Sequence, residues 1–175
     1  MKYLFTFILA LFTVMQSYAQ EEYNPVADPD AVVQSGNMRF TVLTPQMIRI
    51  QYISKKVFED RATFAVVNRR LPVPAFTTSE EDGYLYIKTE AVTLKYRTGS
   101  NPTTFRNRPE FLSVTFNMNG HEVVWYPGKD DALNLKGTTR TLDNGRGDSK
   151  RGELENGILS RGGWALIDES ASAKR

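Results

Sequence analysis

Short runs of alternating apolar and polar residues recur along this chain, with turn-forming residues between them. Residues 38–42 and 48–52 carry the pattern on either side of a break at Thr44-Pro45-Gln46. Period-two alternation places the apolar side chains on one face of a β-strand, and two such runs around a short break indicate an antiparallel hairpin. Because no apolar stripe with a 3.6-residue period accompanies them, the sequence predicts an all-β fold.

The strand pattern continues through the middle of the chain. Further strands are predicted at residues 62–67, 84–89, 92–96, 112–117 and 121–126. Asn119-Gly120, between the last two, is the residue pair that a type I′ hairpin turn favours. Pro72 and Pro74 limit the segment around them to an edge strand or a loop. One strand in about every ten residues favours an antiparallel β-sandwich or barrel.

The first residues have the layout of a secretory signal peptide. A basic start is followed by an apolar run, Tyr3 to Val14, and by a small-x-small cleavage motif at Ser17-Tyr18-Ala19. The apolar run is shorter than the about 20 residues that span a bilayer, and the alternative is a buried N-terminal helix. We expect residues 1–19 to be a signal peptide and the protein to be secreted or periplasmic in a bacterium after cleavage near Ala19. The chain has no cysteine, which excludes a lipid-anchored lipoprotein, so no membrane anchor is expected.

The remaining residues are predicted to form one domain. Residues 20–30 are expected to be an irregular lead-in, 31–170 a β-sandwich, and 171–175 an unstructured tail. Within the sandwich, the charged, glycine-containing residues 129–156 are expected to form a long loop, and loops of this length are usually functional or disordered. The net charge is only +2. Short basic clusters such as Arg69-Arg70 are expected to be solvated edge charges, so no nucleic-acid partner is predicted.

The sequence holds few signals of catalysis or metal binding. The single histidine, His121, follows the Asn-Gly turn, where a solvated side chain is a simpler interpretation than a general base or a metal ligand. No His, Asp or Glu spacing indicates a metal site, and no glycine-rich phosphate loop occurs. We therefore predict no metal and no cofactor. Trp125 and Trp164 are either core residues or platforms that could stack on a sugar ring.

The most distinctive run is residues 157–170, Gly-Ile-Leu-Ser-Arg-Gly-Gly-Trp-Ala-Leu-Ile-Asp-Glu-Ser. Gly162 and Gly163 lie between two short apolar runs. We expect a tight hairpin or corner in which the glycines supply positive φ or permit close backbone approach. The polar rim of this run is expected to be a hydrogen-bonded structural corner or a docking surface.

This run resembles a hallmark of glycoside hydrolase family 31, the α-glucosidase and α-xylosidase family, in which a Gly-(Ile/Leu)-(Ile/Leu)-Ser-Arg-x-Gly-Trp-(Ala/Ser)-(Leu/Val)-(Ile/Val)-Asp-Asp-Ser segment ends an N-terminal β-sandwich. The chain departs from the hallmark at Gly162, where a polar residue is common, and at Glu169, where a second Asp is usual. Residues 134–143 are similar to the family's Leu-Gly-Gly-Thr-x-Arg-Thr-Leu-Asp run, with Lys136 in place of a glycine. The hairpin at residues 42–52 also resembles the family's opening strand pair.

The resemblance implies a sandwich of the galactose-mutarotase-like type that lacks its last strand or strands. In the family a catalytic (β/α)₈ barrel follows the sandwich and carries the catalytic aspartates, so the resemblance implies no catalytic residue and no activity for this chain alone. It implies that the sandwich supports the barrel and shapes the pocket for an α-linked oligosaccharide. Asp143 and Arg140 in the charged loop are the candidate sugar-facing residues, together with Trp125.

A different class of function stays open from the sequence. The chain would then be a free-standing carbohydrate-binding module in which Trp125 or Trp164 stacks on the sugar.

Overall fold

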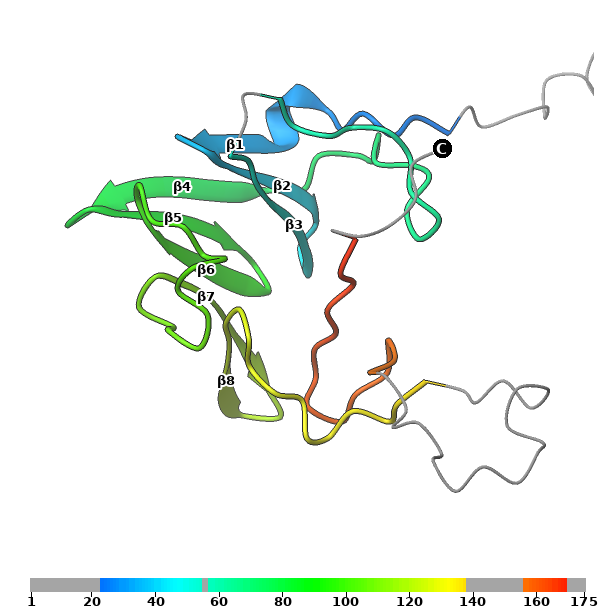
Figure 1. The fold of residues 1–175 in the computed structure, drawn as a ribbon, viewed down its shortest axis with the longest axis vertical. Helices are drawn as coiled ribbons and strands as arrows, with labels where there is room; N and C mark the ends of the chain where they lie inside the picture. The colour runs from blue at the N-terminus through cyan, green and yellow to red at the C-terminus, as the bar shows by residue number, and fades with distance from the viewer. Residues whose placement is uncertain (1–22, 55–56, 138–155, 170–175) are drawn as a thin grey trace, which may run out of the picture.

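The described part of the chain consists of two antiparallel β-sheets and one short 3₁₀ helix (Figure 1). The computed structural model describes residues 23–54, 57–137 and 156–169. Its elements are η1 (Pro29–Ala31), β1 (Val32–Ser35), β2 (Met38–Thr44), β3 (Met47–Tyr52), β4 (Phe76–Glu81), β5 (Tyr84–Thr89), β6 (Val92–Arg97), β7 (Leu112–Met118) and β8 (His121–Trp125). The first sheet has the order β1-β2-β3 and the second the order β4-β5-β6-β7-β8. The predicted antiparallel all-β fold is confirmed.

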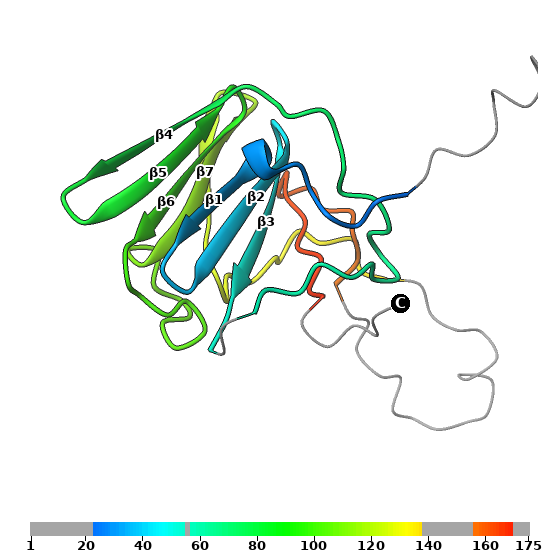
Figure 2. The ribbon, with the colours of Figure 1, turned by 90° about the horizontal axis from the view of Figure 1, so that it is seen from above.

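The two sheets face each other and enclose the core. Their strands lie nearly aligned when the molecule is seen from above (Figure 2), which is the common packing of a β-sandwich. Phe40 on β2 is fully buried and lies against Tyr96 on β6, with their ring centroids 5.4 Å apart. The core cluster consists of Met38, Phe40, Val42, Leu85, Ile87, Leu94, Tyr96 and Leu112. Burial of each large apolar side chain stabilises the fold by about 1.5–3 kcal/mol, so this cluster holds the sheets together.

The hairpins follow the predicted turns. In β2 and β3, Met38 pairs with Tyr52 and Phe40 with Ile50, so the apolar residues of both strands share the inner face. Asn119 and Gly120 have φ values of 54° and 82°, the pair of positive angles that a type I′ turn requires. The hairpin predicted at residues 84–96 is β5 and β6.

One prediction of local structure is wrong. Residues 62–67 form no strand, because Thr63 bonds locally: its amide donates to the Val66 carbonyl at 3.1 Å, and its hydroxyl accepts from the Val66 amide. Of the two alternatives predicted for residues 157–170, a hairpin or a corner, the described residues 157–169 form a corner, and their apolar runs do not pair with each other. The described part of that run is an irregular segment with one bridge, Asn134 to Ser160.

Several predictions fall outside the described residues, among them the signal peptide at 1–19 and the tail at 171–175. The lead-in is irregular from residue 23 and then enters η1. In the ranges that the structure describes, no helix has the length and apolar character needed to cross a membrane.

Candidate functional site

Residues 156–169, which we call the corner segment, lie beside the open side of the sandwich. In Figure 1 the segment runs from the loop that follows β8 towards the first sheet, where it ends near the loop between β3 and β4. It therefore contacts both halves of the molecule, and its two ends are held by different sets of polar contacts.

The glycines of the corner segment are needed for two physical reasons. Gly163 has a φ of +77°, and a Cβ atom there would lie 2.1 Å from Sδ of Met118 at the end of β7. A Cβ atom on Gly162 would lie 3.1–3.3 Å from Ser160 Oγ, Asp131 Oδ1 and Trp164 Nε1. Positive φ and close approach both favour glycine, which confirms the role expected of this pair.

The first end of the segment is held by the Asn134 side chain. Its Oδ1 accepts from the amides of Gly157 at 2.9 Å and Lys136 at 2.8 Å. Its Nδ2 donates to the Gly157 carbonyl at 3.0 Å and to Asp131 Oδ2 at 2.9 Å. All four hydrogen-bonding positions of the amide are therefore used, so Asn134 acts as a structural clasp between residues 131–136 and the corner segment.

Asp131 completes this clasp from a buried position. Asp131 is only 4% exposed, and its Oδ1 accepts from the Ser160 hydroxyl at 2.8 Å. The same Ser160 oxygen accepts from the Gly162 amide at 2.9 Å. A buried carboxylate satisfied by neutral donors is a structural group, and the predicted hydrogen-bonded corner is present in this part of the hallmark.

The second end is held by Glu169. Its Oε1 accepts from the Thr63 hydroxyl, and its Oε2 lies 3.5 Å from Nη2 of Arg69. Arg69 is 1% exposed. Its Nη1 also donates to the backbone carbonyls of Pro25, Asp60 and Arg61 at 3.1–3.4 Å. One buried guanidinium thus joins the lead-in, the loop after β3 and the corner segment.

Arg69 belongs to an arginine cluster on the outer face of the first sheet, formed by Arg39, Arg49 and Arg69 with Asp60 and Glu169. Arg39 forms an ion pair with Asp60, whose Oδ1 is also 3.6 Å from Nη1 of Arg49. Burial lowers the pKa of Arg49, and the charges of Arg69 and Arg39 lower that pKa further. The carboxylates of Glu169 and Asp60 raise it in part. Three guanidinium groups close together are costly to bury, so the two carboxylates are needed to offset their repulsion.

The Glu59 backbone carbonyl holds the loop after β3 against this face through hydrogen bonds. The Glu59 carbonyl accepts from Arg49 and Gln51 at 2.9 Å each and from Arg39 at 3.4 Å. Thr41, which pairs with Arg49 on the same face, is only 2% exposed. The loop after β3 therefore covers the outer face of the first sheet.

The prediction that Arg69-Arg70 are solvated edge charges is wrong for Arg69. Arg70 is half exposed and pairs with Asp28 at 3.3 Å, whereas its neighbour is buried. Sequence analysis also gave no role to Arg39 and Arg49. Their positions between the apolar residues of the first hairpin showed that they point out of the core, but the covering loop could not be inferred.

The predicted sugar-facing residues are placed only in part. Trp125 ends β8 opposite Val114, which packs against the core, so Trp125 is on the inner side of the sheet and is half-buried. Arg140 and Asp143 lie outside the described residues. His121 is exposed, as expected of a turn residue, and Trp164 is half-buried in the corner.

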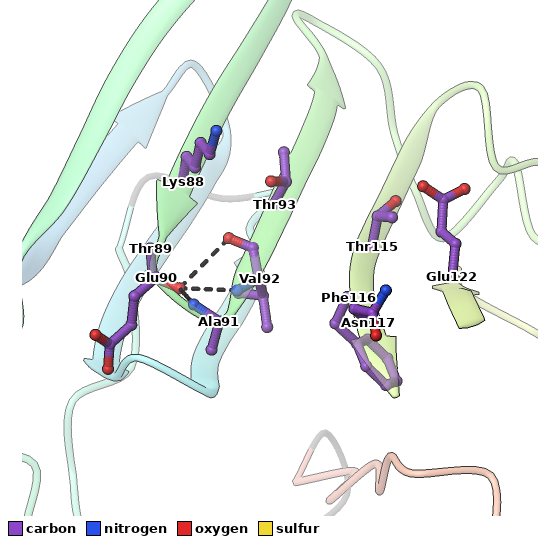
Figure 3. A pocket seen from close by; sticks show the side chains of 10 residues that line it. All are labelled: Lys88, Thr89, Glu90, Ala91, Val92, Thr93, Thr115, Phe116, Asn117 and Glu122. Atoms are coloured by element: carbon purple, nitrogen blue, oxygen red, sulfur yellow. Dashed lines mark hydrogen bonds between the residues drawn. The ribbon is translucent and has the colours of Figure 1, made fainter. Parts of the chain in front are cut away.

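Two depressions lie elsewhere, over the outer face of the second sheet and its β5–β6 turn. Their volumes are about 230 and 220 Å³ (Figure 3 shows the first). Among the residues that the structure describes, no group of three or more His, Asp or Glu lies close enough to hold a metal ion.

No protein-family model matches this chain, and no curated protein matches it with significant sequence similarity. The resemblance to glycoside hydrolase family 31 therefore rests on the residues of its motifs, above all on residues 157–170.

Proposed function

We propose that this chain is the N-terminal, non-catalytic β-sandwich of a secreted family 31 α-glycosidase, of the galactose-mutarotase-like type. In this role it supports a catalytic (β/α)₈ barrel and helps to shape the pocket for an α-linked oligosaccharide. The barrel, on the same chain or a separate one, performs the hydrolysis. Asp143, Arg140 and Trp125 remain the proposed sugar-facing residues.

One observation carries this proposal: the hallmark residues expose their apolar side chains. Ile158 is 72% exposed, Leu159 65%, Leu166 57% and Ile167 51%. Leu133 and Leu135, which flank the bridge to Ser160, are exposed by 57% and 55%. We call these six residues the apolar ridge. Several large apolar side chains that remain exposed along one segment and its bridge partner suggest a surface for a partner, and a neighbouring domain is such a partner.

The clasp described above fixes the ridge in place. Asn134 and Ser160 hold the backbone beside Leu133, Leu135 and Leu159. The amides of Leu135 and Arg161 donate to the carbonyls of Leu159 and Leu133 at 2.9 and 3.1 Å. A fixed backbone that presents apolar side chains outward is suited to rigid docking, because little conformational entropy is lost on binding.

Two measurements test the proposal, and the first concerns catalysis. The purified chain is expected to show no turnover of nitrophenyl α-glucoside or nitrophenyl α-xyloside. Measurable hydrolysis that follows the chain through purification would overturn the proposed non-catalytic role.

The second measurement concerns docking. The chain is mixed with the catalytic barrel of a family 31 α-glycosidase expressed without its own sandwich, and co-elution is followed by size-exclusion chromatography. Leu159→Asp and Leu166→Asp should abolish co-elution, whereas Val57→Asp, at a residue that is 82% exposed outside the ridge, should preserve it. Absence of co-elution for the unmodified chain, or equal co-elution of all variants, contradicts docking through the ridge.

A further inference from the structure

The outer face of the second sheet carries a continuous set of polar side chains. Leu85, Ile87 and Leu94 point into the core, so the residues that alternate with them point outward. Thr77 pairs with Lys88, Lys88 with Thr93 and Thr93 with Thr115, which makes one row across β4, β5, β6 and β7. On β8 the row ends at Val124, which pairs with Thr115, and Glu122 lies two residues away from it. We call this surface the bare face.

Two depressions lie side by side over the bare face and the adjoining β5–β6 turn, and we call the two together the groove. The depression of about 220 Å³ is lined from β4, β5 and β6, and that of about 230 Å³ is lined from β5, β6, the turn between them, β7 and β8. Both are lined by Lys88 and Thr93, so they are neighbours on the sheet (Figure 3 shows Lys88, Thr93, Thr115 and Glu122 along the larger one). Four inter-strand spacings of about 4.8 Å give the groove a length of about 19 Å.

The polar groups of the groove are free to bind a ligand. Within the described residues, the side chains of Thr77, Ser79 and Thr93 form no hydrogen bond, and Lys88 and Glu122 form no ion pair. Hydroxyl, ammonium and carboxylate groups therefore stand along the groove with their hydrogen-bonding capacity unused.

An aromatic ring lines the same groove. The half-buried ring of Tyr86 lies on the bare face, with its centroid 6.4 Å from that of Tyr84. Lys95 Nζ lies 4.2 Å from the Tyr84 centroid and 5.9 Å from that of Tyr86. These contacts hold the Tyr86 ring in position, and a positioned ring can stack on an apolar face of a ligand.

The charged and polar side chains of the groove determine which class of ligand can bind there. Carboxylates of Glu81, Glu90 and Glu122 line the groove and repel a polyanion, while Lys88 repels a polycation. A protein partner would need a larger apolar area than the groove offers. An extended, uncharged polyhydroxylated chain matches it: hydroxyl groups meet the side-chain donors and acceptors, and ring C–H groups meet the aromatic ring.

We propose that the groove between Ser79 and Glu122 on the bare face binds an uncharged oligosaccharide, with Tyr86 as the stacking residue and Lys88 and Thr93 as the floor. This site is separate from the apolar ridge and goes beyond the proposed function, since it would bind glycan at a place remote from the docked barrel.

The test is native affinity electrophoresis of the full chain in gels that contain amylopectin, xyloglucan, mixed-linkage β-glucan or, as the charged probe, polygalacturonate. At least one neutral polysaccharide should retard the chain. Tyr86→Ala and Thr93→Arg should weaken that retardation about tenfold or more, while the matched aromatic control Tyr23→Ala, at a residue 65% exposed outside the groove, should not change it. Circular dichroism of each variant verifies that the fold is kept.

The outcomes separate this proposal from the proposed function. No retardation by any of the three neutral polysaccharides overturns the groove, as does equal retardation of Thr93→Arg, which fills the floor from an outward position. Stronger retardation by polygalacturonate than by the neutral polymers also overturns it. Leu159→Asp, which tests the apolar ridge, should leave glycan retardation unchanged.

Discussion

The outer faces of the two sheets have the same alternating sequence pattern, but one face is covered by a loop and the other is open to solvent. On the first sheet, Arg39, Arg49 and Gln51 are covered by the loop after β3 and direct their donors to Asp60 and the Glu59 carbonyl. On the second sheet, Lys88 and Thr93 stay at the surface of an open groove. Alternation therefore indicates which residues leave the core, while the connections between strands decide whether water or protein meets them.

The difference has energetic consequences. A charge in contact with water costs little and contributes little, whereas a buried charge depends on every partner that offsets its lost hydration. Variants of the covered face should therefore change stability, and variants of the bare face should change ligand binding.

The largest expected effect is that of Arg69→Ala. The variant loses the contacts to three backbone carbonyls and the ion pair with Glu169, so the free energy of unfolding should fall by about 3–5 kcal/mol. Urea unfolding followed by circular dichroism measures it. Lys88→Ala on the bare face is the matched control and should change stability by no more than about 0.5 kcal/mol. Similar losses for both variants would remove the distinction between the faces.

A comparable but smaller loss is expected of Gly163→Ala. Gly163 and Gly83 share nearly the same φ, +77° and +78°, but only at Gly163 would a Cβ atom collide, with Met118, since Gly83 has open space. Backbone strain alone costs about 1 kcal/mol or more, and overpacking adds about 1–3 kcal/mol. Thermal and urea unfolding of both variants should show the larger loss for Gly163→Ala. If Gly83→Ala were equally destabilised, the packing of the corner against β7 would not be the cause.

Glu169→Gln tests how much the Glu169 charge contributes to the stability of the covered face. The variant keeps the shape and a hydrogen-bonding oxygen for Thr63 but removes the charge beside Arg69, and stability should fall by about 1–3 kcal/mol. Glu81→Gln on the exposed edge strand β4 is the control, with no more than about 0.5 kcal/mol expected. A double-mutant cycle with Arg69→Met should show coupling between the two sites, and purely additive losses would argue that they do not interact.

Lys95→Ala should have the smallest effect. Its ammonium group lies over the Tyr84 ring, and an exposed cation–π contact contributes about 0.5–1 kcal/mol. Chemical unfolding checks the value. A loss as large as that for Arg69→Ala would show that the bare face also holds the fold together.

Much of the fold could be predicted from local signals. The residues of β2, β3, β5, β6, β7 and β8 follow from alternation and turn residues, because strand burial on one face imposes a period of two. The strand predicted at residues 62–67 is absent. The apolar content of this run resembles that of a strand, but a local Thr63–Val66 hydrogen bond competes with sheet pairing. Of the hairpin and the corner predicted for the run around Trp164, the structure shows the corner, because no neighbouring strand offers this run a ladder in the described part of the chain.

The candidate sites also differ in whether local sequence could predict them. The hydrogen-bonded corner at Ser160 and Gly162 was expected from the glycine pair and its polar rim. The arginine cluster was not, because Arg69 is separated by many residues from Arg39 and Glu169, and nothing local marks it as buried. The groove on the bare face also depends on the register of five strands, since Tyr86, Thr93 and Thr115 become neighbours only through pairing.

By itself, the sequence determined strands β2, β3 and β5 to β8, their inward faces, the type I′ turn at Asn119-Gly120 and the need for glycine in the corner segment. These features depend on each residue's own backbone preferences and on its nearest neighbours. Only the tertiary structure decided that Arg69 is buried, that the corner segment exposes its apolar side chains, and that one outer face is covered while the other is bare. The burial and pairing of a side chain depend on which distant segment packs over it, and local preference carries no information about that segment.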